Sequence, residues 1–139
     1  RLCEDKSRFA VPAAKLGVGY GYEGIRRLAN LVGPSMVKEI FFTARQFSAA
    51  EAYDMGLVNR VLAPQMLAAY ADDYASRISE NAPLTIESVK AITQSLQLDE
   101  ADRDLDALEA LVKGCFASDD YIEGRRAFME KRKPKFTGR

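Results

Sequence analysis

The sequence predicts an α/β fold in which a few short strands at the start are followed by a mainly helical region. The first twelve residues, RLCEDKSRFAVP, contain two short β-type runs on either side of a polar EDKS turn. From Gly24 onward apolar residues recur at helical spacing, and beyond Pro64 the pattern is helical throughout. Two short strands need further strands to cover them, and Arg1 is not a translation start, so we expect the same polypeptide to continue before residue 1.

The composition is that of an ordinary globular domain. Apolar residues make up 47% and charged residues 29% of the 139 residues, and 20 basic side chains balance 20 acidic ones. This balance gives no reason to expect a nucleic acid or an anionic membrane as the main ligand. No apolar run approaches the roughly 20 residues that cross a bilayer.

The inventory of reactive side chains excludes several kinds of site. The chain has two cysteines, Cys3 and Cys115, and no histidine. A disulfide framework, a zinc site and a serine or cysteine nucleophile activated by histidine are therefore not expected within this chain. We expect two reduced thiols in a cytoplasmic protein.

Two helices joined by a corner are expected after the glycine-rich start. Apolar residues from Ile25 to Val32 follow helical spacing up to Gly33, and Pro34 stands at the start of a second helical pattern. The Gly33-Pro34 pair should therefore form the corner.

A short capped helix and a short strand come next. Ser48 and Glu51 form a capping-box pattern that opens the segment SAAEAYDMG, and Gly56 is expected to end that helix. Residues 57–62, LVNRVL, alternate apolar and polar side chains, which predicts a short strand.

Four more helices are expected beyond Pro64. Three of them carry apolar stripes, which most often mean packing in a core or between subunits. The acidic residues between Asp99 and Asp104 favour the start of a helix through its dipole. Residues 118–120, Ser-Asp-Asp, form the cap region of the last helix, which is expected to finish in a basic run from Arg125 to Lys135.

The stretch from Arg8 to Leu28, RFAVPAAKLGVGYGYEGIRRL, is where we expect a functional site, because its glycines let the backbone approach a ligand and aim N–H groups at it. Gly19, Gly21 and Gly24 spell the G-x-G-x-x-G pattern of dinucleotide-binding turns. The context disfavours that interpretation, since no buried strand precedes the pattern and a second helix, not a second strand, follows it.

Four segments of the chain, in order, resemble the enoyl-CoA hydratase/isomerase (crotonase) family. They are RFAVPAAKLGVGYGYEGIRRL, KEIFFTARQFSAAEAYDMGLVNRVL, NAPLTIESVKAI and FASDDYIEGRRAFMEKRKPKF. The resemblance covers the whole chain but only the C-terminal half of the family's catalytic domain. It implies that residues 1–63 belong to the spiral crotonase core and that residues 64–139 form a helical region for packing and trimerisation.

The resemblance also implies the chemistry. Family members hold the thioester carbonyl in an oxyanion hole of two backbone N–H groups, and hydratases use two glutamates. The oxyanion donors and the first glutamate would lie before residue 1. The second glutamate follows a proline, and here that pair is Pro12-Ala13. An alanine cannot act as an acid or base, which is worth about 10²–10⁴-fold in rate. Glu23 is our candidate replacement, with Tyr20 and Tyr22 as weaker ones; the alternative for Glu23 is a solvent-facing residue stabilised by the helix dipole.

Binding of coenzyme A is assigned by the same resemblance. An aromatic residue and a lysine of the family match Phe128 and Lys131, which are three residues apart and are therefore expected on one helical face. The alternative is that the basic run only complements the helix dipole. Gly19 and Gly21 are expected to contact the substrate. No metal and no cofactor beyond the coenzyme A of the substrate are expected.

These observations predict an acyl-CoA-acting enzyme of fatty acid metabolism that hydrates or isomerises an enoyl-CoA. The alternatives are other enolate chemistry, such as decarboxylation or thioester hydrolysis, and a non-catalytic acyl-CoA-binding homologue. A homotrimer or hexamer is expected, and residues 1–139 alone should be inactive because the oxyanion hole would be missing.

Overall fold

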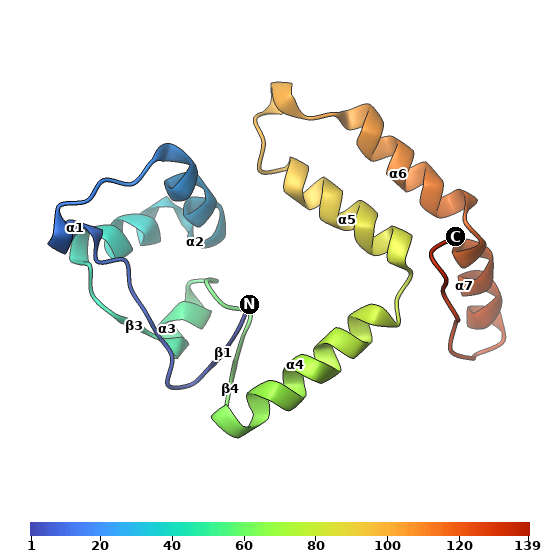
Figure 1. Ribbon diagram of the computed structural model, residues 1–139, viewed down its shortest axis with the longest axis horizontal. Helices are drawn as coiled ribbons and strands as arrows, with labels where there is room; N and C mark the ends of the chain where they lie inside the picture. Colours follow the sequence, from blue (N-terminus) through green and yellow to red (C-terminus); the bar gives the residue numbers. More distant parts are fainter. The chain divides into compact units, whose positions relative to one another are not determined.

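The computed structural model describes residues 1–139, which form two compact units (Figure 1). The first unit is Arg1–Asp72 and the second is Asp73–Arg139. The boundary falls inside helix α4 (Pro64–Ser79), whereas the sequence suggested a division at residue 63. The roles suggested for the two parts, spiral core and trimerisation region, remain predictions.

Four short strands lie in the first unit and form two separate pairs. They are β1 (Leu2–Glu4), β2 (Arg8–Phe9), β3 (Phe47–Ser48) and β4 (Arg60–Leu62). β1 runs parallel to β4, with Cys3 opposite Val61, and β2 runs antiparallel to β3, with Phe9 opposite Phe47. The three strands expected from the sequence are confirmed. β1 and β2, which flank the polar turn, each pair with a strand much later in the chain.

A short helix, α1 (Ala13–Leu16), lies between the first strands and the glycine loop. The sequence analysis did not predict this helix between Pro12 and the glycines. Residues 13–16, Ala-Ala-Lys-Leu, are all strong helix formers. Pro12 occupies the N-cap, and Gly17 ends the helix in the left-handed conformation, with φ 65°. α1 packs against helix α2.

Helix α2 (Tyr22–Thr43) contains the predicted corner. Gly33 has φ 78° and ψ 157°, so the helix is broken there into two parts. Glycine takes positive φ without steric cost. Pro34 favours an extended conformation at the residue before it and restarts the helix without needing its own N–H. The corner is confirmed.

Helix α3 (Ala49–Asp54) begins with the capping box that the sequence predicts. The Ser48 hydroxyl accepts a hydrogen bond from the Glu51 N–H at 3.2 Å, and the Glu51 carboxylate accepts one from the Ser48 N–H at 2.7 Å. Gly56, with φ 78°, follows the helix end. Small side chains on α3 allow close packing in the core of this unit, which comprises Cys3, Ala49, Ala52 and Val58 with Phe9, Leu57 and Val61 around them.

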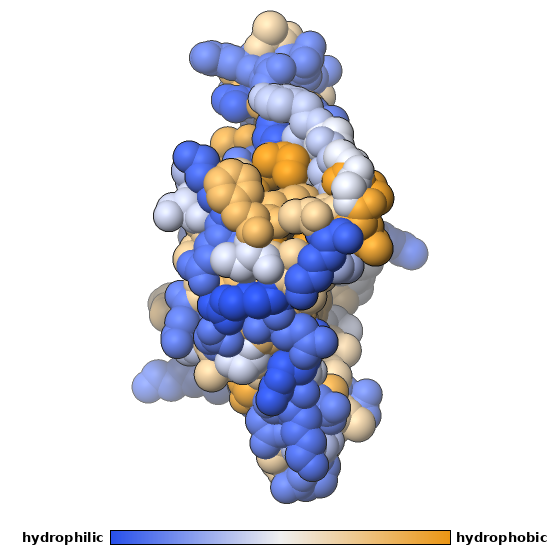
Figure 2. Space-filling model, turned by 90° about the vertical axis from the view of Figure 1, so that its left-hand side faces the viewer, coloured by the Kyte–Doolittle hydropathy of each residue, from blue (hydrophilic) through white to orange (hydrophobic).

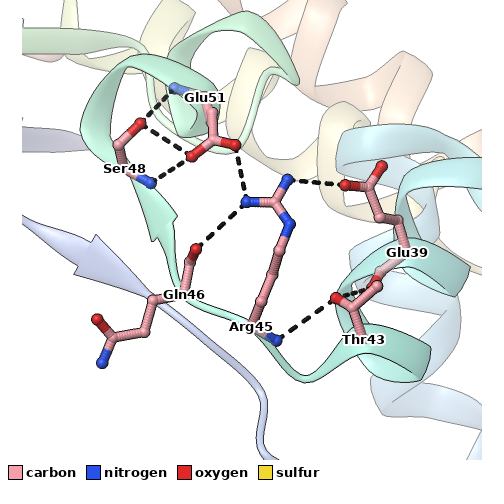
Figure 3. A network of polar contacts seen from close by, with 6 residues as sticks. All are labelled: Glu39, Thr43, Arg45, Gln46, Ser48 and Glu51. Atoms are coloured by element: carbon pink, nitrogen blue, oxygen red, sulfur yellow. Dashed lines mark hydrogen bonds and ion pairs between the residues drawn. The ribbon is translucent and has the colours of Figure 1, made fainter.

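An arginine ties the end of α2 to the start of α3 (Figure 3). Arg45 donates to Glu39 and to Glu51, each at 2.7 Å, and its guanidinium lies 3.7 Å from the centre of the buried Phe47 ring. The bonds to Glu39 and then to Glu51 raise the pKa of Arg45. The Ser48 N–H, Arg45 and the Ser48 hydroxyl lower the pKa of Glu51 to about 2.

The second unit is helical. Besides the end of α4 it contains α5 (Pro83–Ser95), the 3-10 helix η1 (Glu100–Asp102), α6 (Leu105–Ala117) and α7 (Asp119–Met129). α5 and α6 run side by side (Figure 1). Side chains cap two of these helices, since Asp104 caps α6 and Ser118 caps α7; only the cap region of α7 was expected from the sequence. None of the helices combines the length and hydrophobicity that a membrane span requires.

Candidate functional site

Ala13 stands at the first position of α1 and is buried. Its carbonyl accepts the Val18 N–H at 3.1 Å and also the N–H of Gly17. These bonds turn the chain from α1 into the glycine loop. The methyl group of Ala13 is enclosed, and it supplies no proton donor or acceptor.

The loop from Gly17 to Gly21 lies open. Gly19 and Gly21 are exposed, and a Cβ added to either would meet no atom within 4 Å. Tyr20 holds the loop to the second part of α2 through an edge-on contact with Phe41, with ring centres 5.0 Å apart. The absence of steric crowding leaves room for a ligand at these glycines.

Glu23 lies in the first turn of α2, where the helix dipole favours a carboxylate. It forms an ion pair with Arg26 at 3.0 Å, and its side chain is 59% exposed. The Arg26 guanidinium also lies 5.7 Å from the centre of the Tyr22 ring. Two of the predicted acid–base candidates, Glu23 and Tyr22, thus share one arginine on the exposed start of α2.

The predicted coenzyme A contacts lie at the end of α7, in the second unit. Phe128 is in the last turn and is 83% exposed. Lys131 lies beyond the helix, which ends at Met129, so the expectation that both residues share one helical face is wrong. The reason is that Lys131 adopts the left-handed conformation, with φ 53°, which ends the helix. A turn joins the two residues instead.

This turn has the hydrogen bonds of a Schellman motif. The Lys131 N–H donates to the Phe128 carbonyl at 3.2 Å, and the Arg132 N–H donates to the Ala127 carbonyl at 3.0 Å. The left-handed position of this motif is usually glycine, because a side chain costs about 1–2 kcal/mol there. In this chain the position holds Lys131. Contacts around the turn must therefore hold it in place.

An arginine fork supplies the first of these contacts. Arg132 donates to both oxygens of Glu123, at 2.6 and 2.9 Å, and also to Glu130 at 2.5 Å. Glu123 accepts the N–H of Lys135 as well, at 2.9 Å. The bonds from Arg132 and then from Lys135 lower the pKa of Glu123 to about 2, and those to Glu123 and Glu130 raise the pKa of Arg132.

A buried carboxylate supplies the second contact. Asp120 accepts the N–H groups of Thr137 and Gly138 at 2.7 and 2.8 Å. Its own N–H donates to the carbonyl of Arg139 at 3.1 Å. The sequence interpretation placed Asp120 in the cap region of α7, but Ser118 provides the cap and Asp120 binds the returning end of the chain. Residues 132–139 thus fold back along α7.

Some cations of the basic run form ion pairs with acidic side chains, whereas others form none. Arg132 is engaged by Glu123 and Glu130, and Lys133 pairs with Glu80 at 2.5 Å. Lys131 is exposed and takes part in no ion pair. Most of the run lies just beyond the helix end, and the alternative that it complements the helix dipole stays open. Lys131 is thus one of the exposed cations of the run that can meet an anionic ligand.

An apolar pocket of about 540 Å³ adjoins this turn. It lies among α5, α6 and α7, and its wall includes Val89, Val112, Phe116, Phe128 and Phe136. Phe136, on the returning segment, also packs on Gly124, where an added Cβ would lie 3.4 Å from the ring. Phe128 is thus both a pocket-lining and an exposed ring, which suits a flat apolar ligand group.

Sequence reasoning placed Arg132 in the basic run but missed Glu123 and the ion pair between the two residues. The sequence gives little indication of this ion pair, because an acidic residue and an arginine nine positions apart do not face each other on a helix. They meet because the chain reverses at Lys131. No group of three or more Cys, Asp or Glu side chains lies together in a way that could hold a metal ion.

Comparison with known proteins identifies the family. The model of the enoyl-CoA hydratase/isomerase family matches residues 1–139. A crotonyl-CoA hydratase of Syntrophomonas wolfei is 37% identical over 137 residues, which are 98% of this chain and 52% of that protein. A carnitinyl-CoA dehydratase of Citrobacter koseri is 38% identical, over 99% of this chain and 54% of its own length. The chain thus spans about half the length of the curated relatives it matches.

Solved structures agree. An enoyl-CoA hydratase from Bacillus anthracis superposes with a TM-score of 0.88 at 30% identity, covering 100% of this chain and 54% of that one. An enoyl-CoA hydratase from Mycobacterium tuberculosis gives 0.84 at 29% identity, covering 99% and 55%. With a family model that matches every residue and neighbours this similar in structure, the chain belongs to the enoyl-CoA hydratase/isomerase family and has its crotonase-type fold.

Proposed function

We propose that the protein carrying this chain acts on acyl-CoA thioesters and that it hydrates or isomerises the double bond of an enoyl-CoA through an oxyanion-stabilised enolate. Relatives named as crotonyl-CoA hydratase and carnitinyl-CoA dehydratase support an acyl-CoA substrate. The chain covers only about half of these relatives, so we propose the activity for the full-length protein and not for residues 1–139 alone.

The observation that carries the proposal is the surface at the end of α7. An exposed aromatic ring, Phe128, is followed three residues later by an exposed and unpaired ammonium group, Lys131. A nucleotide presents an aromatic base and phosphates, which such a pair binds by stacking and by charge. This surface would hold the nucleotide end of coenzyme A.

The catalytic half of the proposal concerns Glu23. Ala13 supplies no acid, so a carboxylate on the glycine loop or at the start of α2 must take that role if the reaction is a two-acid hydration. Glu23 is exposed beside the open glycines 19 and 21, where the loop can admit a substrate. We assign the acid–base role to Glu23.

The test is the loss of enoyl-thioester absorbance when the full-length protein meets a short 2-enoyl-CoA. Glu23→Gln keeps the size of the side chain and removes its acid, so the rate should fall about 10²–10⁴-fold. Glu109→Gln is the matched control, because Glu109 is also an exposed glutamate in an ion pair within one helix. An active Glu23→Gln protein would disprove the assignment of Glu23.

One observation favours a second candidate function. The enclosed methyl group of Ala13, in place of the family's glutamate, would also fit a protein that binds acyl-CoA without turning it over. Equilibrium binding of acyl-CoA combined with no consumption of enoyl-CoA, and no isomerisation, decarboxylation or thioester hydrolysis, would establish this function. Turnover of any of these substrates would exclude it.

We also propose self-association into a trimer or hexamer, as the family resemblance implies. The predicted apolar stripes of the second unit support this proposal because part of each stripe is not covered within the chain. Several of their large side chains are exposed, among them Ile78, Ile86, Val89, Leu96 and Phe116. Exposed apolar groups of this extent mark interaction surfaces.

A further inference from the structure

We propose that Glu123 and Arg132 are positioning residues for coenzyme A, because their ion pair holds Lys131 in a backbone conformation that a lysine does not favour and so fixes where its side chain leaves the chain, three residues after Phe128. The proposal rests on the function proposed above. It adds a role for two residues that lie beyond the ligand contacts themselves.

The first step concerns Lys131 itself. Its φ of 53° lies in the left-handed region, at the position of the Schellman motif where glycine is favoured. A glycine would make the same turn with less strain, but it would carry no charge. Strained residues of this kind persist where the surroundings over-determine them and are concentrated at functional sites. The use of lysine here indicates that its side chain is needed.

The second step concerns what holds the turn. The Arg132 fork binds both oxygens of Glu123, at 2.6 and 2.9 Å, and bidentate pairs of this kind fix geometry as well as charge. Glu123 is two turns back on α7, so the pair ties the residue after Lys131 to the body of the helix. Glu123 is only 20% exposed, which limits competition from water.

The third step concerns the other hydrogen bonds that, together with the Glu123–Arg132 pair, hold the C-terminal segment against α7. Glu123 also accepts the Lys135 N–H, and one turn earlier the buried Asp120 accepts the N–H groups of Thr137 and Gly138. The chain after Lys131 is therefore held at two carboxylates along α7. Its end cannot swing away and let the turn at Lys131 relax while these bonds are made.

The experiment measures the affinity of the full-length protein for coenzyme A by calorimetry, together with its melting temperature. Lys131→Gly should raise the melting temperature, because it relieves the strain, and should weaken binding about tenfold or more. Glu123→Gln should weaken binding about threefold to tenfold. Arg132→Lys, which keeps the charge but loses the fork, should do the same and serves where Glu123→Gln does not fold.

A double-mutant cycle separates positioning from a general loss of structure. If Glu123 acts through Lys131, the variant with both Glu123→Gln and Lys131→Gly should bind coenzyme A no more weakly than Lys131→Gly alone. Glu109→Gln, which removes another glutamate ion pair far along α6, should leave binding unchanged.

The outcomes distinguish this proposal from the one on which it rests. A native protein that does not bind coenzyme A overturns both. Binding that Lys131→Gly weakens, but that Glu123→Gln and Arg132→Lys leave intact or weaken additively with it, overturns the positioning role alone. A lower melting temperature for Lys131→Gly would show that the lysine is not strained and would overturn the proposal as well.

Discussion

At the scale of single residues, the same chemistry recurs in both units. Glu51 and Glu123 each accept a backbone N–H and an arginine guanidinium, and each has its pKa lowered from 4.5 to about 2. Each also joins two segments of the chain, namely α2 to α3 through Arg45 and α7 to the C-terminal segment through Arg132. Ionised carboxylates therefore stabilise the two places where the chain changes direction, after α2 and after α7.

These two carboxylates predict an acid-sensitive stability. Their pKa is lowered in the folded state, so the folded protein binds fewer protons than the unfolded one between about 4.5 and about 2. The contribution of both ion pairs should be fully present above pH 4.5 and should be lost as the pH falls towards 2. Urea unfolding at steps between pH 6 and 2 measures this, and the variant with both Glu51→Gln and Glu123→Gln should show a flatter profile. An equally steep profile would contradict the prediction.

Phe128 predicts a change in substrate preference. If its ring stacks on the nucleotide end, Phe128→Ala should lose about 1–3 kcal/mol of binding, which is about 5-fold to 150-fold in KM for an acyl-CoA. The KM for the same acyl group on N-acetylcysteamine, which lacks the nucleotide, should not change. Steady-state assays with both thioesters test this, and an equal loss for both would show that Phe128 acts through folding.

At the scale of elements, the sequence predicted the corners and helix caps that depend on neighbouring residues. The sequence predicted three such features, since each depends on residues within four positions: the corner at Gly33, the capping box at Ser48 and the cap at Ser118. The sequence did not predict where α7 ends. Lysine is a good helix former, and Lys131 is held out of the helix by contacts that Glu123 and Asp120 make with the segment after it. The sites stay predictions for a related reason, because no periodicity encodes how Glu23 or Phe128 meets a ligand.

The corner of α2 gives a prediction with a built-in control. Gly33→Ala places a side chain at φ 78° and should destabilise the protein by about 1–2 kcal/mol. Gly114 lies inside α6 in open space, so Gly114→Ala should instead stabilise it by up to about 1 kcal/mol. Thermal unfolding of the two variants compares them directly. If both substitutions change the stability in the same direction, the positive φ of Gly33 does not determine the effect of Gly33→Ala.

At the scale of the whole molecule, helix α5 of the second unit buries small residues and exposes large ones. On α5 the buried residues are Ser88 and Ser95, seven positions apart, while Ile86, Val89 and Leu96 are exposed. Figure 2 faces the side of the first unit, and there too hydrophobic residues gather among hydrophilic ones. The amphipathic pattern of α5 was predictable, but which side a partner covers was not, because the pattern does not say whether its apolar face packs within the chain or against another copy.

The exposed face of α5 predicts how the assembly can be broken. Val89 is 54% exposed at the centre of this face, and a charge buried in an apolar interface is costly, so Val89→Lys should shift the full-length protein from a trimer or hexamer towards monomers. Gln94→Lys adds the same charge at an exposed polar position of α5 and should leave the assembly intact. Light scattering after size exclusion gives the mass of each variant. A native protein that is monomeric at micromolar concentration would contradict self-association itself, whereas an assembled Val89→Lys protein would show that the copies meet elsewhere.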